Sequence, residues 1–301
     1  MTVSNPLEQC TICPRRCGVN RIAGQRGFCR AGHRARVARA ALHHWEEPCI
    51  SGRRGSGTVF FSWCNLRCVF CQNYDISQEG FGSDVSAERL GQIFLELQEK
   101  GAHNVNLVSP TPYAPIILQA LDIASSKGLR IPVVYNTNAY ENPETLHALK
   151  GRVSVFLPDL KYFDDTLARR CSSAPDYFRI ATTAIRTMVE IAGKPVFDEN
   201  GLITRGVIVR HLVLPGHADD SIEVLRWIAT ELKGSVLVSL MSQYVPMYRA
   251  SRYLDLSRKI SSREYEMVLD ELYSLGLEDG YVQELDSADS RFTPPFNLEG
   301  V

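Results

Sequence analysis

The chain has 301 residues, 45% of them hydrophobic, and a formal net charge of −1. A nearly neutral chain provides no basic field for nucleic acid, and no apolar run approaches membrane-spanning length, so neither partner is expected. Nine cysteines without the core of a secretory signal predict a reducing, cytoplasmic setting, where thiols serve metals or catalysis rather than disulfides.

The first group of cysteines lies near the N-terminus, in a module that we expect to span residues 1–50. Four thiolates can complete a closed tetrahedral shell, which suits a structural zinc or an auxiliary iron–sulfur cluster. The nearby arginines would lower the pKa of these thiols. We therefore predict a second metal site, with iron–sulfur and zinc both open, at Cys10, Cys13, Cys17 and Cys29, spaced C-x2-C-x3-C-x11-C.

The segment that follows the cysteine module is less informative. Residues 36–45 predict a strand or hairpin on that module. His43 and His44 are adjacent, so in a strand they point to opposite faces and are not expected to share one ion. Cys49 is interpreted as a plain small residue.

From residue 57 onward, apolar runs alternate with segments of helical periodicity. This alternation predicts parallel strands joined by helices, with the loops after the strands converging on one face. The predicted strands are 57–61, 104–108, 131–135, 153–157, 207–214 and 235–240. The predicted helices are one capped by Ser86, then 115–127, 143–150, 176–192 and 219–232. We assign residues 51–260 to this α/β unit.

Residues 261–301 form a tail with a predicted helix at 261–275. Its start has the capping-box pattern of Ser261 and Glu264. An edge strand is expected at 281–283. The tail is expected either to cover the open side of the α/β unit or to present a partner surface.

The most distinctive stretch is 62–73, directly after the first predicted strand. It contains Cys64, Cys68 and Cys71, spaced C-x3-C-x2-C. Three thiolates can hold three corners of a cubic iron–sulfur cluster and leave the fourth iron without a protein ligand. An open coordination position makes a metal site reactive. The alternatives are a thioredoxin-like pair at Cys68 and Cys71, or a zinc site.

With Phe70 in the aromatic position, this stretch resembles the C-x3-C-x-aromatic-C motif of radical S-adenosylmethionine (SAM) enzymes. The wider sequence from 55 to 73 is similar to the branch described as pyruvate formate-lyase activating enzyme-like, which usually has Gly where this chain has Trp63. The resemblance implies a partial (β/α)6 barrel of the α/β class. It also implies SAM and a [4Fe-4S] cluster bound by Cys64, Cys68 and Cys71.

The resemblance assigns SAM contacts to the loops after the second and third strands. Ser109 and Thr111 stand where classical activating enzymes carry Gly-Gly-Glu, whose backbone and carboxylate contact the methionyl amino group of SAM. Carbonyl groups freed by the neighbouring prolines could make that contact here. The alternative is a plain proline-rich turn. Asn136 and Asn138 match the family sequence that lies near the SAM sulfonium and ribose. Amide side chains both donate and accept hydrogen bonds, which suits ribose hydroxyls.

Later strands supply further expected contacts. Asp159 and Lys161 share one face of an extended segment, and the resemblance places Lys161 against the methionyl carboxylate. A solvated ion pair is the alternative. Arg210 needs an anionic partner, either the SAM carboxylate or an acid of the barrel. Gln243 or Tyr244 is assigned to the adenosine. Cys171, expected in a loop, is interpreted as neutral.

The implied activity is reductive cleavage of SAM to methionine and a 5′-deoxyadenosyl radical that abstracts hydrogen. The electron would come from a donor such as flavodoxin or ferredoxin. The substrate is either a backbone glycine of a partner glycyl radical enzyme, or a small molecule or peptide without such a partner. A non-enzymatic iron–sulfur electron carrier or metal scaffold is the third interpretation.

Overall fold

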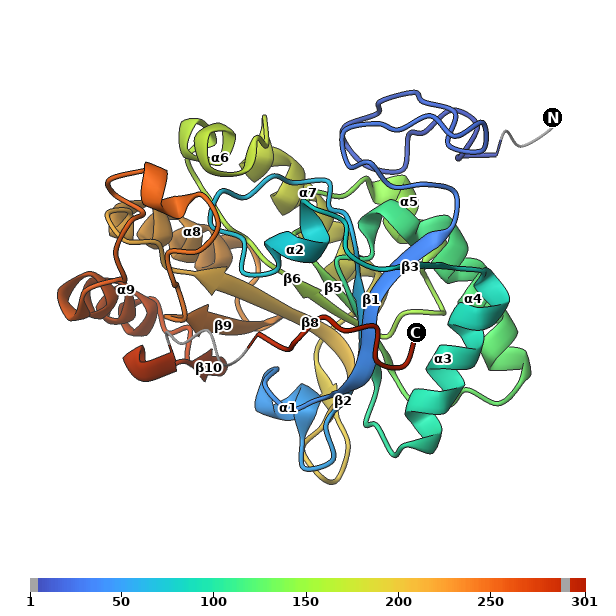
Figure 1. Ribbon diagram of the computed structural model, residues 1–301. Coiled ribbons are helices and arrows are strands. Elements are labelled where there is room, and N and C mark those ends of the chain that lie inside the picture. Colours follow the sequence, from blue (N-terminus) through green and yellow to red (C-terminus); the bar gives the residue numbers. More distant parts are fainter. Residues whose placement is uncertain (1–4, 288–292) are drawn as a thin grey trace.

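The computed structural model describes residues 5–287 and 293–301. Its centre is a sheet in which six parallel strands follow one another as neighbours (Figure 1). These strands are β2 (Ser56–Phe61), β4 (Val105–Val108), β5 (Val133–Thr137), β6 (Val155–Pro158), β8 (Ile203–Leu212) and β9 (Leu237–Met241). The six predicted strands are thus confirmed, and the sheet forms the expected partial barrel.

Further strands extend both edges of this sheet. β1 (Ala35–His43) pairs antiparallel with β2, and β3 (Ser83–Val85) pairs with β1. β10 (Gly280–Val282) adds a parallel strand beside β9, and β7 (Val196–Phe197) pairs with β8. The strand expected at 36–45 is therefore present, but its placement on the cysteine module was wrong. Its buried Val37, Ala38 and Ala40 belong to the cores around the barrel strands.

Helices connect the strands and cover the outside of the sheet. The longer ones are α3 (Ala87–Glu99), α4 (Ala114–Ser126), α5 (Pro143–Ala148), α6 (Asp165–Ser172), α7 (Tyr177–Ala192), α8 (Ala218–Glu231) and α9 (Ser262–Ser274). Short turns form α1 (Pro48–Ser51), α2 (Tyr74–Ser77), η1 (Thr111–Tyr113), η2 (Ala250–Arg252) and η3 (Leu285–Ser287). The predicted Ser86 cap and the Ser261 capping box are both confirmed. Cys171 lies buried in α6 rather than in a loop.

The N-terminal cysteine module contains no regular helix or strand between residues 5 and 34. It is held against the barrel near α5, as Figure 1 shows for the blue segment. The side chains of Asn142 and Thr145 donate to the carbonyls of Thr11 and Ile12, both at 2.7 Å. The module therefore docks over the face on which the loops after the strands converge.

The C-terminal tail reaches both edges of the sheet. Near β9, the Gln283 amide donates to the Leu240 carbonyl at 3.0 Å. At the other edge, Leu298 donates to Ala38 of β1, and Ala40 donates to Glu299. The tail therefore packs against strands on both sides of the barrel sheet. Within the described part of the chain, no helix is both long and apolar enough to cross a membrane.

Candidate functional site

The cysteine loop leaves the barrel directly after β2. Trp63 has a φ of 69°, a left-handed conformation that glycine adopts without strain. Its indole lies against Gly80, where a Cβ atom would come within 2.1 Å of the ring. The conformation explains why glycine suits this position in the related branch, and the packing explains how this chain accommodates tryptophan.

The sulfur atoms of Cys64, Cys68 and Cys71 lie among polar groups. Each is within hydrogen-bonding distance of a side chain: Asn138 Nδ2 at 3.3 Å from Cys64, Ser172 Oγ at 3.0 Å from Cys68, and Ser77 Oγ at 3.2 Å from Cys71. The backbone amide of Leu66 also donates to Cys64 at 3.4 Å. Groups that donate to sulfur stabilise thiolate ligands, so these surroundings fit an iron–sulfur cluster.

The protonation of these thiols also fits a metal-binding role. Burial, reinforced by the neighbouring cysteines, raises the pKa of Cys64 to about 12 and that of Cys71 to about 11. Burial raises the pKa of Cys68 as well, against the opposing charge of Lys161. The metal-free thiols therefore keep their protons at neutral pH, and binding a metal would release them.

No group of three or more His, Cys, Asp or Glu side chains within residues 5–287 and 293–301 is arranged to hold a single metal ion. A cubic cluster separates its thiolate ligands more widely than one ion does. The fit of Cys64, Cys68 and Cys71 therefore rests on their spacing, on the polar groups around sulfur and on their shared surroundings.

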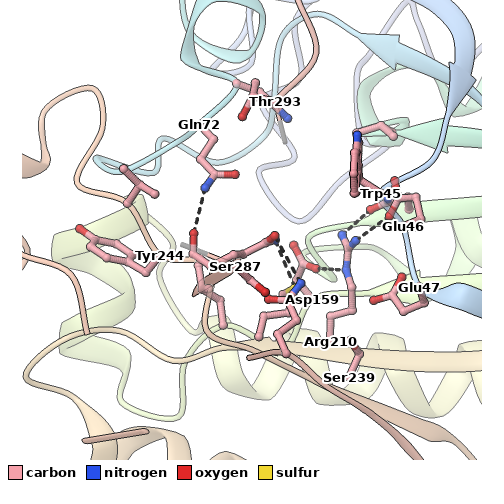
Figure 2. Close-up of a pocket in the computed structure, with 18 of the residues that line it drawn as sticks. Trp45, Glu46, Glu47, Gln72, Asp159, Arg210, Ser239, Tyr244, Ser287 and Thr293 are labelled. Atoms are coloured by element: carbon pink, nitrogen blue, oxygen red, sulfur yellow. Dashed lines mark hydrogen bonds and ion pairs between the residues drawn. The ribbon is translucent and has the colours of Figure 1, made fainter. Parts of the chain in front are cut away.

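Beside the cysteine loop, a chain of ion pairs runs across the barrel (Figure 2). Lys161 Nζ lies 2.7 Å from Asp159 Oδ2, and Arg210 Nε lies 2.7 Å from Asp159 Oδ1. Arg210 also donates to Glu46 at 3.1 Å and to Asn136 at 2.7 Å. Burial opposes ionisation of Asp159, but the two cations outweigh it and lower its pKa. The Asp159–Lys161 pair is thus a buried pair rather than a solvated one.

Another buried carboxylate connects the two loops that were assigned to SAM. Glu141 Oε1 accepts hydrogen bonds from Thr111 at 2.6 Å and from Thr137 at 2.5 Å. The Ser109 amide donates to the Asn136 carbonyl at 3.0 Å, which joins the same loops through their backbones. Thr111 is therefore committed to Glu141, a residue that sequence reasoning missed because its burial depends on how the loops pack.

These elements surround a cavity of about 540 Å³. Its lining includes many of the residues predicted from the sequence, namely Cys68, Phe70, Cys71, Asn136, Asp159, Lys161, Arg210 and Gln243. Predicted residues outside this lining are Cys64, Ser109, Thr111 and Asn138, of which Asn138 contacts Cys64. The Phe70 ring packs against Tyr244 with centroids 5.6 Å apart. The lining also contains Trp45, Glu46 and Glu47, which sequence reasoning assigned no role.

The structure also brings the N-terminal cysteines together. Burial raises the pKa of Cys13 to about 12, and the neighbouring thiols Cys29 and Cys10 add to the shift. The pKa of Cys29 is likewise raised by burial, and its neighbours include Cys10 and Cys17. The four thiols predicted as one metal site are therefore neighbours in space.

Arg15 links the two cysteine groups. Its guanidinium donates to the Asn65 carbonyl at 3.0 Å and to the Ser173 carbonyl at 2.5 Å. Burial lowers the pKa of Arg15, and thiolate charge at Cys13 or Cys64 would oppose that shift. Arg15 thus stands between the N-terminal module and the cysteine loop.

A partial parallel barrel with a three-cysteine loop after β2 and polar loops around one cavity defines a cofactor-dependent barrel enzyme. The model of the radical SAM superfamily matches residues 58–228, more than half of the chain. The protein belongs to the radical SAM superfamily. Membership implies a [4Fe-4S] cluster and SAM as cofactors.

Comparisons with individual proteins agree with this assignment. The chain is 34% identical to a Methanocaldococcus jannaschii protein described as "Uncharacterized protein MJ0674", over 91% of this chain and 77% of the relative. Among solved structures, it resembles Streptococcus suis SuiB bound to the precursor peptide SuiA, with a TM-score of 0.53, 16% identity, and coverage of 75% of this chain and 48% of SuiB.

The FeFe-hydrogenase maturase HydG from Carboxydothermus hydrogenoformans gives a TM-score of 0.51 at 14% identity, over 78% of this chain and 56% of HydG. The chain thus spans about half the length of these two structures. At such identities the likeness concerns the fold alone.

Proposed function

We propose that this protein cleaves SAM reductively at a [4Fe-4S] cluster held by Cys64, Cys68 and Cys71. The observation that supports this most is the shared cavity, where two of these cysteines face the Asp159–Lys161 pair. When bound, the cluster and SAM supply an electron and a 5′-deoxyadenosyl radical, which abstracts hydrogen from a substrate. The protein then has to bind SAM in one orientation and exclude other hydrogen sources.

Several residues have clear tasks in that orientation. Lys161 would bind the methionyl carboxylate through a charge-assisted hydrogen bond. Asp159 holds the ammonium group of Lys161 in place at 2.7 Å. Arg210 is committed to Asp159, Glu46 and Asn136, which favours the barrel-acid alternative over the SAM carboxylate. Asn138 would stabilise the cluster ligand Cys64.

The remaining SAM contacts are proposed for backbone and amide groups. Because the Thr111 hydroxyl is bound to Glu141, the loop from Ser109 to Thr111 would contribute backbone carbonyls. Asn136 and Gln243 line the cavity, and the Gln243 amide would contact adenine. Asn136 already bonds Arg210 and Glu46, so only its remaining hydrogen-bonding capacity would be used for the ribose. Phe70 would pack beside the cluster, supported by Tyr244.

We also propose a second metal site at Cys10, Cys13, Cys17 and Cys29. Their common location supports it, as does Arg15, which connects the module to the cysteine loop. An iron–sulfur cluster suits the separation of these thiols, whereas zinc would require them to move closer together. A one-electron donor such as flavodoxin or ferredoxin would reduce the protein.

The substrate belongs to one of two classes. It is a backbone glycine of a partner glycyl radical enzyme, as the activating-enzyme resemblance implies, or it is a small molecule or peptide. The solved structure of SuiB with a precursor peptide supports the peptide class by likeness of fold. Deuterium transferred from a labelled substrate into 5′-deoxyadenosine distinguishes the two.

The test is anaerobic reconstitution with iron and sulfide, followed by strong reductant and SAM. We expect wild type to produce 5′-deoxyadenosine and the Cys64→Ser variant to produce none above background. Cys49→Ala, which removes a buried thiol outside the cysteine loop, is the matched control. A metal-loaded wild type that leaves SAM intact would overturn the proposal and favour an electron carrier.

A further inference from the structure

One acidic part of the cavity lining comes from the connection between β1 and β2. Two consecutive carboxylates, Glu46 and Glu47, form it. Glu47 is fixed in place because its carbonyl accepts hydrogen bonds from Ile50 at 2.8 Å and from Ser51 at 3.0 Å, which begin α1. Its side chain therefore enters the cavity from a defined backbone position.

The two carboxylates differ in their partners. Glu46 Oε1 accepts from Asn106 at 3.0 Å and from Asn136 at 3.3 Å, while Oε2 pairs with Arg210 at 3.1 Å. Glu47 is only 8% exposed, and its Oε2 has no hydrogen-bond partner among the described residues. The polar neighbours of this carboxyl group include Arg210 and Ser239. Leaving Oε2 unpaired is unfavourable, so Glu47 can take a further donor from outside the chain.

The charges around the cavity indicate the sign of that donor. Within the described lining, five carboxylates face two cations. The cations, Lys161 and Arg210, are already paired with Asp159 and Glu46. The carboxylates are Glu46, Glu47, Asp159, Glu284 and Asp286. The carboxyl groups outnumber the cations, which favours a cationic ligand when Glu47 is ionised.

The position of Glu47 separates it from Lys161, the proposed contact of the methionyl carboxylate. The charge of Lys161 opposes the rise that burial causes in the pKa of Cys64, Cys68 and Cys71, so this cation lies toward the cysteine end of the cavity. In Figure 2, Arg210 lies between Asp159 and Glu47. Trp45 lines the same end and is 63% exposed, and an aromatic face attracts cations. Burial raises the pKa of Glu47, and a bound cation would favour its ionised form.

We propose that Glu47 binds an aliphatic ammonium or guanidinium group of the substrate, at the end of the cavity opposite the cysteine loop. The abstracted hydrogen would then lie between that cation and SAM. This inference rests on the proposed SAM-dependent function and specifies its substrate class as a basic small molecule or a basic side chain of a peptide.

The experiment measures binding by the anaerobically reconstituted protein with SAM and without reductant. One pair of probes is n-hexylamine and 1-hexanol, and the second is the acetylated amides of lysine and norleucine. We expect wild type to bind the amine of a pair at least about thirtyfold more tightly than its uncharged counterpart. A preference within the n-hexylamine pair identifies a free amine as the source of the cation. A preference within the lysine amide pair identifies a peptide side chain.

Variants decide whether Glu47 is responsible. Glu47→Gln should reduce the preference to less than about threefold, roughly the loss of one buried charge pair. Glu284→Gln, an exposed carboxylate of the same cavity, should keep it. Equal loss in both variants, or a preference that persists in Glu47→Gln, overturns the inference. A drop in SAM affinity of Glu47→Gln with unchanged amine preference would assign the carboxylate to SAM and also overturn it.

The wild-type comparison does not depend on the variant being folded. If Glu47→Gln does not fold, the lack of any preference for amine in wild type still overturns the inference. Glu47→Asp then supplies the second variant, which should retain the preference because it retains the charge. Since this titration requires no SAM cleavage, amine binding by a protein that does not cleave SAM would refute the proposed function and leave the inference standing.

Discussion

Replacing Glu141 with glutamine should remove a pH-dependent component of stability. Burial raises the pKa of Glu141 from 4.5 to about 7, although hydrogen bonds from Thr111 and Thr137 oppose the shift. The folded protein thus holds the proton more tightly than the unfolded chain does. This contribution is complete below the unfolded pKa of 4.5 and is lost as the pH rises through about 7.

The size of the effect follows from the shift. A rise of about 2.5 pKa units corresponds to about 3 kcal/mol between the two protonation states. Glutamine imitates the protonated carboxyl group and can still accept from both threonines. We therefore expect Glu141→Gln and wild type to have similar unfolding free energies at pH 4.5. At pH 8 the variant should be more stable by about 3 kcal/mol.

The assay is urea denaturation of the metal-free, reduced protein at several pH values, analysed as the difference between variant and wild type. Glu144→Gln is the control, because its side chain is 75% exposed and lies three residues further along the chain. If the difference in unfolding free energy between Glu141→Gln and wild type stays constant from pH 4.5 to 8, the raised pKa of Glu141 is refuted.

Two further predictions concern the cofactors. Lys161→Gln should weaken SAM binding between about tenfold and a hundredfold, which is the range for a hydrogen bond to a charged group. Equilibrium dialysis measures the affinity, and Lys150→Gln, at an exposed lysine, is the control. An unchanged affinity would argue against the contact between Lys161 and the methionyl carboxylate. Cys13→Ala should lower the total iron or zinc per chain, because it removes one ligand of the second metal site. Elemental analysis measures this content. The same metal content as in wild type would mean that the N-terminal thiols bind no metal.

The order of elements was predictable because each buried strand and each amphipathic helix has its own periodicity. The strand at 36–45 shows the limit of such reasoning. Its alternation of small apolar residues indicates an extended segment but not its partner, and β1 pairs with β2 of the barrel. Cys171 was placed in a loop although Asp164 caps α6, its carboxylate accepting from Leu167 at 2.6 Å. That signal was present in the sequence.

The site was predictable where a motif concentrated its chemistry in a few positions. Cys68, Cys71, Asp159 and Lys161 line one cavity as expected. Glu46 and Glu47 could not be found in this way, because they belong to no motif and their burial depends on how the chain folds. Only the fold brings Glu46 within 3.1 Å of Arg210. The fold also buries Glu47 and leaves its Oε2 without a hydrogen-bond partner among the described residues. The same packing favours a barrel acid over the SAM carboxylate as the partner of Arg210.

The central claim is that three cysteine ligands leave one iron open for SAM. Electron paramagnetic resonance of the reduced, reconstituted protein tests it directly, using SAM labelled with ¹⁵N at the methionyl amino group. We predict that SAM changes the cluster spectrum and that the label shows hyperfine coupling to the cluster. A spectrum that saturating SAM leaves unchanged, without nitrogen coupling, would contradict the account.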